Sequence, residues 1–465
     1  MSTSGTPGSN GPFISDDTRA LAAYIAGAAA QAAPEDVLEK ARHHLLDTLA
    51  AMVSGSRLRA GVLASAYVQA IAGRGHCNVA GTRIQTSAVD AALANGMMAH
   101  GDETDDSHLG GRFHPGCGIV PCVLAAAQLQ PASGLAVLKA VALGYDIGTR
   151  FNLSLGPRKL YAGGHSTHSV GPLFGGAAAA AALMQLSEEQ VRYALSYAVQ
   201  QASGVQCWSR DEHHVEKAFD FGGMPARNAM AAATMVAAGF TGVPDALAGP
   251  NNFFSAFSTD PRPDELVREL GSRFEIRQAT IKKWCVGSPI QGAIDAVLAL
   301  MQTHGLNAAQ LDKLVIELPD DRCQLVNNRN MPNINVQHLV ALTLIDGGLN
   351  FESSHEHGRM TDPAILAVKS KIDLQPNESL TTALPPRQVI LTAHTLDGRV
   401  LRHHAKAVRG TPDDPMTRTE VMDKAVDLMA PILGAAQARE LTRQVIHLDE
   451  VADAGAVLGA LIAAD

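Results

Sequence analysis

Hydrophobic residues recur every three or four positions over most of the first 270 residues, the spacing expected of helices that bury one face. Pro34 and the two acids after it begin one such helix, because proline and acidic side chains suit a first helical turn. Its apolar face carries Val37, Ala41, Leu45, Leu49 and Met52. Asp47 lies on or beside this face, and we expect a buried structural acid bonded to a neighbouring helix end. Further helices are predicted at about residues 16–31, 58–72, 86–98, 118–128, 134–153, 163–184, 187–203 and 226–238.

The pattern changes after about residue 270, where helices and strands are mixed. Strands are predicted at 274–281, 313–318, 387–394 and 400–406, and helices at 336–346 and 362–370. The last two strands flank Asp397–Gly398, a strong signal for a two-residue hairpin turn. From Thr417 onward the pattern is helical again, and this tail could pack back onto the first domain.

Composition and charge restrict the class of protein. The chain has 465 residues, of which 46% are hydrophobic, 18% charged and only 4% aromatic, which suits closely packed helices in two or three domains. The net charge of -9 argues against nucleic acid as a partner. The alanine runs are interrupted before they reach about 18 residues, so no membrane span is expected. Six cysteines without a CxxC pair favour reduced thiols and a cytoplasmic location.

One polar segment, residues 98–121, stands between two apolar runs and reads MAHGDETDDSHLGGRFHPGCGIVP. It contains three histidines and four acids within fifteen positions. One reading is a solvated acidic loop, which charge runs often are. The interleaving of imidazoles with carboxylates, and an HPG sequence directly before an apolar helix start, favour a catalytic site instead.

Four stretches resemble the MmgE/PrpD family, which includes 2-methylcitrate dehydratases, cis-aconitate decarboxylases and iminodisuccinate epimerases. They are HGDETDDSH with the later HPG, HSTHSVGPLFGGAAAAAA, KAFDFGGMPARNAMAAATMVAAGFTG and IKKWCVGSPIQGAIDA. The resemblance spans about residues 16–450. It implies a homodimer, a large all-helical domain built from both chain ends, a smaller α+β lid domain, and a site between the two. It also implies chemistry on a small di- or tricarboxylate with no metal and no organic cofactor.

With this resemblance, we predict a mainly α fold with the following division of the chain. Residues 1–14 are a disordered N-terminal tail, 15–270 the helical domain, 271–412 the α+β lid domain, and 413–465 C-terminal helices that return to the helical domain.

Matching the motifs position by position implies the site residues. The catalytic candidates are Glu103, Ser107, His114, His165, Lys217 and Lys282. His114 and His165 are the preferred proton-transfer pair, since an unshifted imidazole titrates nearest neutral pH. Lys217 and Lys282 are assigned to substrate carboxylates, and Glu103 and Ser107 to orienting a histidine or the substrate. The further substrate-binding candidates are Gln291, His338 and Asp106, although Asp105 and Asp106 also suit bonds to backbone amides of the loop.

The chain departs from the family pattern at several positions. Gly287 and Gln291 replace a Cys or His pair, and His338 replaces a tyrosine. Glutamine can bond a carboxylate but cannot shuttle protons near pH 7, so these changes put a 2-methylcitrate or cis-aconitate assignment in doubt.

The other histidines and two cysteines have plainer interpretations. His100 and His108 are expected to be structural, and His168 either a ligand or solvent-facing. Surface positions are expected for His213, His214, His355 and His357, and positions facing the helix core for Cys117 and Cys122.

The leading functional hypothesis is a cofactor-independent lyase of the dehydratase type, which acts by α-proton abstraction. An epimerase or isomerase of an amino or imino dicarboxylate is the alternative. Decarboxylation, a metal-dependent hydrolase and a non-catalytic carboxylate-binding relic are the remaining possibilities.

Overall fold

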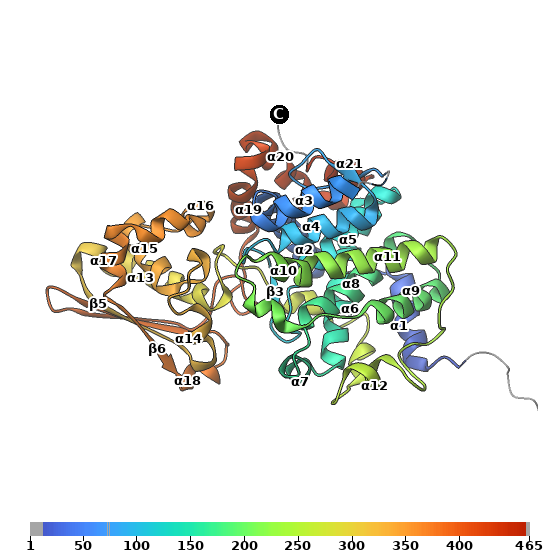
Figure 1. Ribbon diagram of the computed structural model, residues 1–465, viewed down its shortest axis with the longest axis horizontal. Helices are drawn as coiled ribbons and strands as arrows, with labels where there is room; N and C mark the ends of the chain where they lie inside the picture. The colour runs from blue at the N-terminus through green and yellow to red at the C-terminus, as the bar shows by residue number, and fades with distance from the viewer. Residues whose placement is uncertain (1–12, 72, 74, 462–465) are drawn as a thin grey trace, which may run out of the picture.

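The computed structural model describes residues 13–461 except 72 and 74, and it shows a mainly helical protein in two parts (Figure 1). Among the described residues, one hydrophobic core combines residues 21–285 with 416–461, and a second core lies within residues 286–405. The predicted fold class is therefore confirmed: a helical domain built from both chain ends, and a smaller α+β lid domain. The predicted domain boundaries stay predictions, and the prediction for residues 1–12 lies outside the described residues.

The helical domain begins with helices that follow one another along the chain. They are α1 (Asp16–Gly27), α2 (Glu35–Gly55), α3 (Arg59–Ile71), α4 (Ala88–Ala99), α5 (Gly116–Leu129), α6 (Gly134–Ser154), α7 (Pro157–Ala162), α8 (Thr167–Leu183), α9 (Glu188–Gln201), α10 (Val215–Ala218), α11 (Met224–Ala237) and α12 (Phe253–Phe257). After the lid domain, α19 (Arg418–Leu433), α20 (Ala435–Ile446) and α21 (Ala454–Leu458) complete it. No helix in the described part of the chain is both long and apolar enough to span a membrane.

Serine caps explain why several of these helices begin where they do. The side-chain oxygens of Ser15, Ser87, Ser133 and Ser187 each accept a backbone N–H from three residues further on, at the starts of α1, α4, α6 and α9. Each cap satisfies a backbone donor that has no partner within the helix. Gln190 completes a capping box with Ser187.

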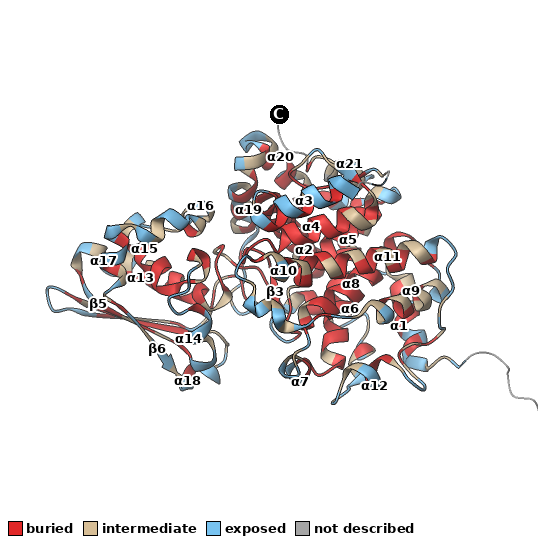
Figure 2. Cartoon of the chain, viewed as in Figure 1, coloured by how far each residue is buried: buried red, intermediate tan, exposed pale blue. Residues whose placement is uncertain are grey.

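Helix α8 lies at the centre of the helical domain, among α5, α6, α9 and α11. Its alanine run is buried along its whole length. Glycines allow backbones to meet there: a Cβ at Gly175 would lie 2.4 Å from the carbonyl oxygen of Gly144 in α6. Figure 2 shows the buried residues concentrated along α2, α4 and α5 as well. This dense core is a rigid support for the loops at its edge.

The chain returns to the helical domain through α19, which packs against α2 (Figure 1). Lys424 on α19 places its Nζ 2.6 Å from Oδ1 of Asp47, and both side chains are buried. Asp47 is thus the buried structural acid expected from the sequence, with an ammonium group as its partner. The same Nζ donates to the carbonyl oxygen of Thr104 at 3.0 Å, and this bond ties the polar segment to α19.

The lid domain is a four-stranded sheet with helices on one side (Figure 1). The strand order is β6 (Ile372–Asn377), β5 (Leu311–Pro319), β7 (Val389–Thr395) and β8 (Val400–Ala405), and only β5 and β6 run parallel. Its helices are α13 (Gln291–His304), α14 (Asp320–Val326), α15 (Val336–Asp346), α16 (Phe351–His355), α17 (Pro363–Lys369) and α18 (Glu378–Thr381). The predicted β7–β8 hairpin is present. Strand β6, which was not predicted, contains Pro376 and lies at the sheet edge, where proline is tolerated.

The predicted strand at 274–281 is mostly wrong. Residues Glu275–Gln278 form a 3₁₀ turn, and only β4 (Ala279–Thr280) is extended. Strand β4 pairs antiparallel with β3 (Ser107–His108), with Ser107 opposite Thr280. The short pair joins the polar segment to the chain that leads into the lid domain, and it places Lys282 directly beside the polar segment.

Candidate active site

The polar segment is buried, and all four of its carboxylates have partners. Asp102 faces His355, Glu103 faces Lys217 and Lys282, Asp105 faces His100 and His114, and Asp106 faces His44 and Tyr145. A solvated acidic loop, the plainer of the two readings, is therefore wrong. Buried charge without partners would be strongly destabilising, and here each acid lies against a base, a hydroxyl or a backbone amide.

Asp105 lies between two imidazoles. Its Oδ2 is 2.9 Å from Nδ1 of His100, and its Oδ1 is 3.1 Å from Nδ1 of His114. A carboxylate only accepts hydrogen bonds, so each Nδ1 is the donor, and in the neutral form of each ring Nε2 then carries the lone pair. Burial acts to raise the pKa of Asp105, but His100, His114 and Lys282 outweigh it and hold that pKa well below the usual range.

Glu103 lies between Lys217 and Lys282, the two lysines predicted from the motifs. Its Oε1 forms a very short ion pair with Nζ of Lys217, and its Oε2 is 3.6 Å from Nζ of Lys282. Lys282 is fully buried and also donates to the carbonyl oxygen of Glu103 at 2.9 Å, whereas the Lys217 side chain is 20% exposed. Burial acts to raise the pKa of Glu103, but the two ammonium groups hold it well below its usual range. Lys217 is thus the ammonium that a ligand reaches more easily.

An aromatic wall closes one side of the cluster. Phe221 comes from the π-helical turn η2 (Phe219–Gly223), and its ring stacks on His168 at 3.7 Å and on His100 at 4.3 Å between centroids. Trp208 stands perpendicular to Phe221 at 4.7 Å. Nζ of Lys217 lies 5.2 Å from the Phe221 ring centroid, in range for a cation–π contact.

The structure brings four predicted residues together: Glu103, His114, Lys217 and Lys282. Ser107 lies nearby on β3 and is buried, and its Oγ has no hydrogen-bond partner among the described residues. His165 is exposed, and its ring faces Phe257 at 6.1 Å. A role for His165 in proton transfer stays a prediction.

The three further substrate-binding candidates have other partners or other surroundings. Asp106 holds Nδ1 of His44 at 2.7 Å and the backbone N–H of Gly116 at 2.9 Å, so its predicted bond to a backbone amide is confirmed. The same prediction for Asp105 is wrong, because its carboxylate bonds two imidazoles. The side chain of Gln291 bonds the backbone of residues 284 and 286 through three hydrogen bonds. His338 is buried in the lid domain, and within the described part of the chain its Nε2 has no hydrogen-bond partner. Burial lowers its pKa to about 4. Contact of these residues with substrate stays a prediction.

Three histidines lie in surroundings other than those predicted from the sequence. His214 is buried, not on the surface, and its ring lies 5.1 Å from that of His100. His168 packs on Phe221, and His355 reaches from the lid domain to Oδ2 of Asp102 at 2.7 Å. One signal could have found His214: it precedes Lys217 by three residues at a helix start, which puts both on one side. Nothing in the local pattern around His355 points to Asp102.

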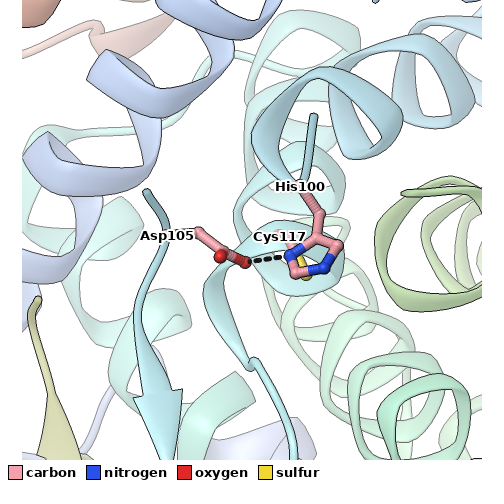
Figure 3. Close-up of side chains that lie close together, drawn as sticks. All are labelled: His100, Asp105 and Cys117. Atoms are coloured by element: carbon pink, nitrogen blue, oxygen red, sulfur yellow. Dashed lines mark hydrogen bonds and ion pairs between the residues drawn. The ribbon is translucent and has the colours of Figure 1, made fainter. Parts of the chain in front are cut away.

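One group with possible metal ligands, His100, Asp105 and Cys117, is drawn in Figure 3. Figure 3 shows Nδ1 of His100 facing Asp105, with Cys117 beside the ring. Burial and the nearby Asp105 raise the pKa of the Cys117 thiol well above its usual value. The thiol points at the carbonyl oxygens of His114 and Phe221, at 3.3 and 3.4 Å. Metal binding needs the thiolate, so this group suits a structural role better than an ion.

The fold and the site define a two-domain enzyme. Its ionisable side chains meet in a largely buried cluster beside the domain junction. Two family models match the chain, the MmgE/PrpD N-terminal domain over residues 19–266 and the MmgE/PrpD C-terminal domain over residues 284–450. The chain belongs to the MmgE/PrpD family, as its motifs suggested.

Curated relatives match along nearly the whole length. The cis-aconitate decarboxylase-like protein oryM of Aspergillus oryzae is 25% identical, with 91% of this chain and 93% of the relative covered. The cis-aconitate decarboxylase of Aspergillus terreus is 23% identical, with 91% of each chain covered. The human cis-aconitate decarboxylase is 22% identical, with 94% of this chain and 92% of the relative covered.

Proposed function

We propose that this protein is a lyase of the dehydratase type, which removes a proton from a carbon beside a carboxylate of a small di- or tricarboxylate. One observation carries the proposal: Asp105 orients two imidazoles through their Nδ1 atoms, with two ammonium groups beside them. Imidazoles with free Nε2 atoms can move protons near neutral pH, and ammonium groups can hold the substrate's carboxylates.

His114 is the imidazole we assign to proton transfer. Its side chain is 12% exposed, whereas that of His100 is fully buried. Removal of an α-proton leaves negative charge delocalised onto the adjacent carboxylate, and a nearby ammonium stabilises that charge. Lys217, held over Phe221 and partly exposed, has the access that this role needs. A substrate carboxylate would bind the ammonium group of Lys217 either together with Glu103 or in its place.

Dehydration requires two proton movements. The base takes the α-proton, the C–O bond of a β-hydroxyl breaks, and a proton must reach the departing oxygen to release water. The candidate donors of this second proton are His114, once it has taken the α-proton, and the ammonium group of Lys217.

Decarboxylation is the second candidate, and the printed names of the relatives favour it. In that reaction a C–C bond breaks, carbon dioxide leaves, and the carbanion takes a proton. His114 in its protonated form would then be the donor. The same side chain would therefore take a proton in dehydration and give one in decarboxylation.

The test compares His114→Gln with the natural protein on a panel of hydroxy-polycarboxylates and unsaturated tricarboxylates. Alkene absorbance reports dehydration, released carbon dioxide reports decarboxylation, and solvent deuterium without either product reports epimerisation. We expect His114→Gln to lower kcat by about 10²–10⁴-fold, the usual contribution of general acid–base catalysis. His447→Gln, at an exposed position far along the chain, is the matched control. Full activity of His114→Gln, or no turnover on any substrate, would contradict the proposal.

We also propose a homodimer, as the family resemblance implies. An exposed apolar stripe on α3 supports it, because Leu63, Tyr67 and Ile71 follow at intervals of four residues and are all about half exposed. Light scattering should report two chains per particle, and Tyr67→Glu should shift the mass toward one chain. A monomeric natural protein would contradict this.

A further inference from the structure

We propose that His100, Glu103 and His214 form a binding site for a divalent transition-metal ion such as zinc, and that the bound ion inhibits the enzyme. The three residues come from the end of α4, from the polar segment and from the start of α10. Binding itself stands on the geometry alone, whereas the inhibition rests on the proposed function.

The three side chains already converge. One ligand atom from each lies within 4.8 Å of the others, and all three residues are buried. The Nε2 atoms of His100 and His214 are buried and have no hydrogen-bond partner among the described residues. Two imidazole nitrogens and a carboxylate oxygen are a ligand set that zinc accepts, with an open position left for a water or a substrate atom.

The imidazoles are held in the form that binds a metal. Figure 3 shows the hydrogen bond between Nδ1 of His100 and Asp105, which fixes the ring and turns Nε2 away from the carboxylate. A carboxylate behind a ligating imidazole is the usual support in metal sites.

The ammonium group of Lys217 competes with a metal ion for Glu103. This group forms an ion pair with Oε1 of Glu103. A metal ion that takes Glu103 as ligand must displace this ammonium. The ion then occupies the space beside Lys217 where we place the substrate carboxylate, so zinc and substrate exclude each other.

The experiment titrates zinc chloride into the full-length, metal-stripped protein and follows binding by calorimetry, with no substrate present. The diagnostic variant is His214→Asn, because His214 has a φ of 55° and asparagine tolerates this left-handed conformation. His213→Asn, at the exposed neighbouring position, is the matched control. We expect about one zinc per chain, affinity at least about tenfold weaker in His214→Asn, and unchanged affinity in His213→Asn.

Lys217→Gln should change the zinc affinity in the opposite direction to His214→Asn. This difference separates the proposed site from zinc binding at the surface. Removal of the competing ammonium should strengthen zinc binding, although the same change should weaken substrate binding. Equal zinc affinity in His214→Asn and the natural protein, or weaker zinc binding in Lys217→Gln, would overturn the site. If zinc binds as described but the chain turns over no polycarboxylate, the site stands and the proposed function fails.

Discussion

Asp105 is the residue on which the proposed chemistry depends most. Its two oxygens face the imidazoles of His100 and His114 and the ammonium group of Lys282. Its role is to position others: by accepting from both Nδ1 atoms, it selects the tautomer that leaves Nε2 of His114 free for a proton.

We therefore expect Asp105→Asn to lower kcat by about 10²-fold or more, with a changed pH profile. An amide has only one accepting oxygen, so one of the two imidazoles must lose its acceptor and can adopt the other tautomer. Rates measured from pH 5 to 9, together with circular dichroism to confirm folding, check this. A folded Asp105→Asn variant with unaltered kcat and pH profile would show that the tautomer is set elsewhere.

The turn η2 is the element that builds the wall of the site, and a backbone contact holds it in place. A Cβ on Gly222 would lie 2.1 Å from the carbonyl oxygen of Gly96 on α4. This contact fixes Phe221, and through it the stacking of His100 and His168. An insertion of this π-helical kind is often found at functional sites.

Gly222→Ala should lower the free energy of unfolding by about 1–3 kcal/mol, the usual effect of overpacking. It should also lower activity beyond the loss of folded protein, because η2 must shift and carries Phe221 with it. Urea unfolding and kcat on the folded fraction measure the two effects. Gly348→Ala is the matched control, since a Cβ there meets no atom of the described residues within 4 Å. Equal effects of the two substitutions would contradict the close contact.

At the scale of the whole molecule, the lid domain and the helical domain meet in an ion pair. Nε2 of His355 on α16 lies 2.7 Å from Oδ2 of Asp102 in the polar segment. Burial acts to lower the pKa of His355, but Asp102 outweighs it and raises that pKa. Burial acts to raise the pKa of Asp102, but His355 outweighs it and lowers that pKa. The lid domain is thus bonded to the same segment that carries Glu103 and Asp105.

The ion pair should stabilise the protein in a defined pH window. The raised pKa of His355 gives stability that is present below about pH 6.5 and lost as pH rises through the folded-state pKa. The lowered pKa of Asp102 gives stability that is present above about pH 4 and lost as pH falls through its folded-state pKa. His355→Gln should therefore lower Tm at pH 5.5 more than at pH 9. The control is His357→Gln, which is exposed; an equal loss of Tm at both pH values would argue against the ion pair.

The sequence by itself determined the parts that depend on neighbouring residues. The helix that begins at the Ser187 capping box and the hairpin around Asp397–Gly398 follow from local hydrogen bonds and turn geometry, so both were predictable. The motifs also identified Glu103, His114, Lys217 and Lys282, which do converge.

Only the tertiary structure decided which charges face one another. The pairing of β3 with β4, the burial of His214 and the reach of His355 to Asp102 join segments that are distant along the chain. Local periodicity carries no information on such contacts, because burial and charge pairing depend on how separate helices pack. The sequence favoured a site over a solvated loop for the polar segment but could not show that the segment is buried. The packing of α19, η2 and the lid domain around it made it the buried site.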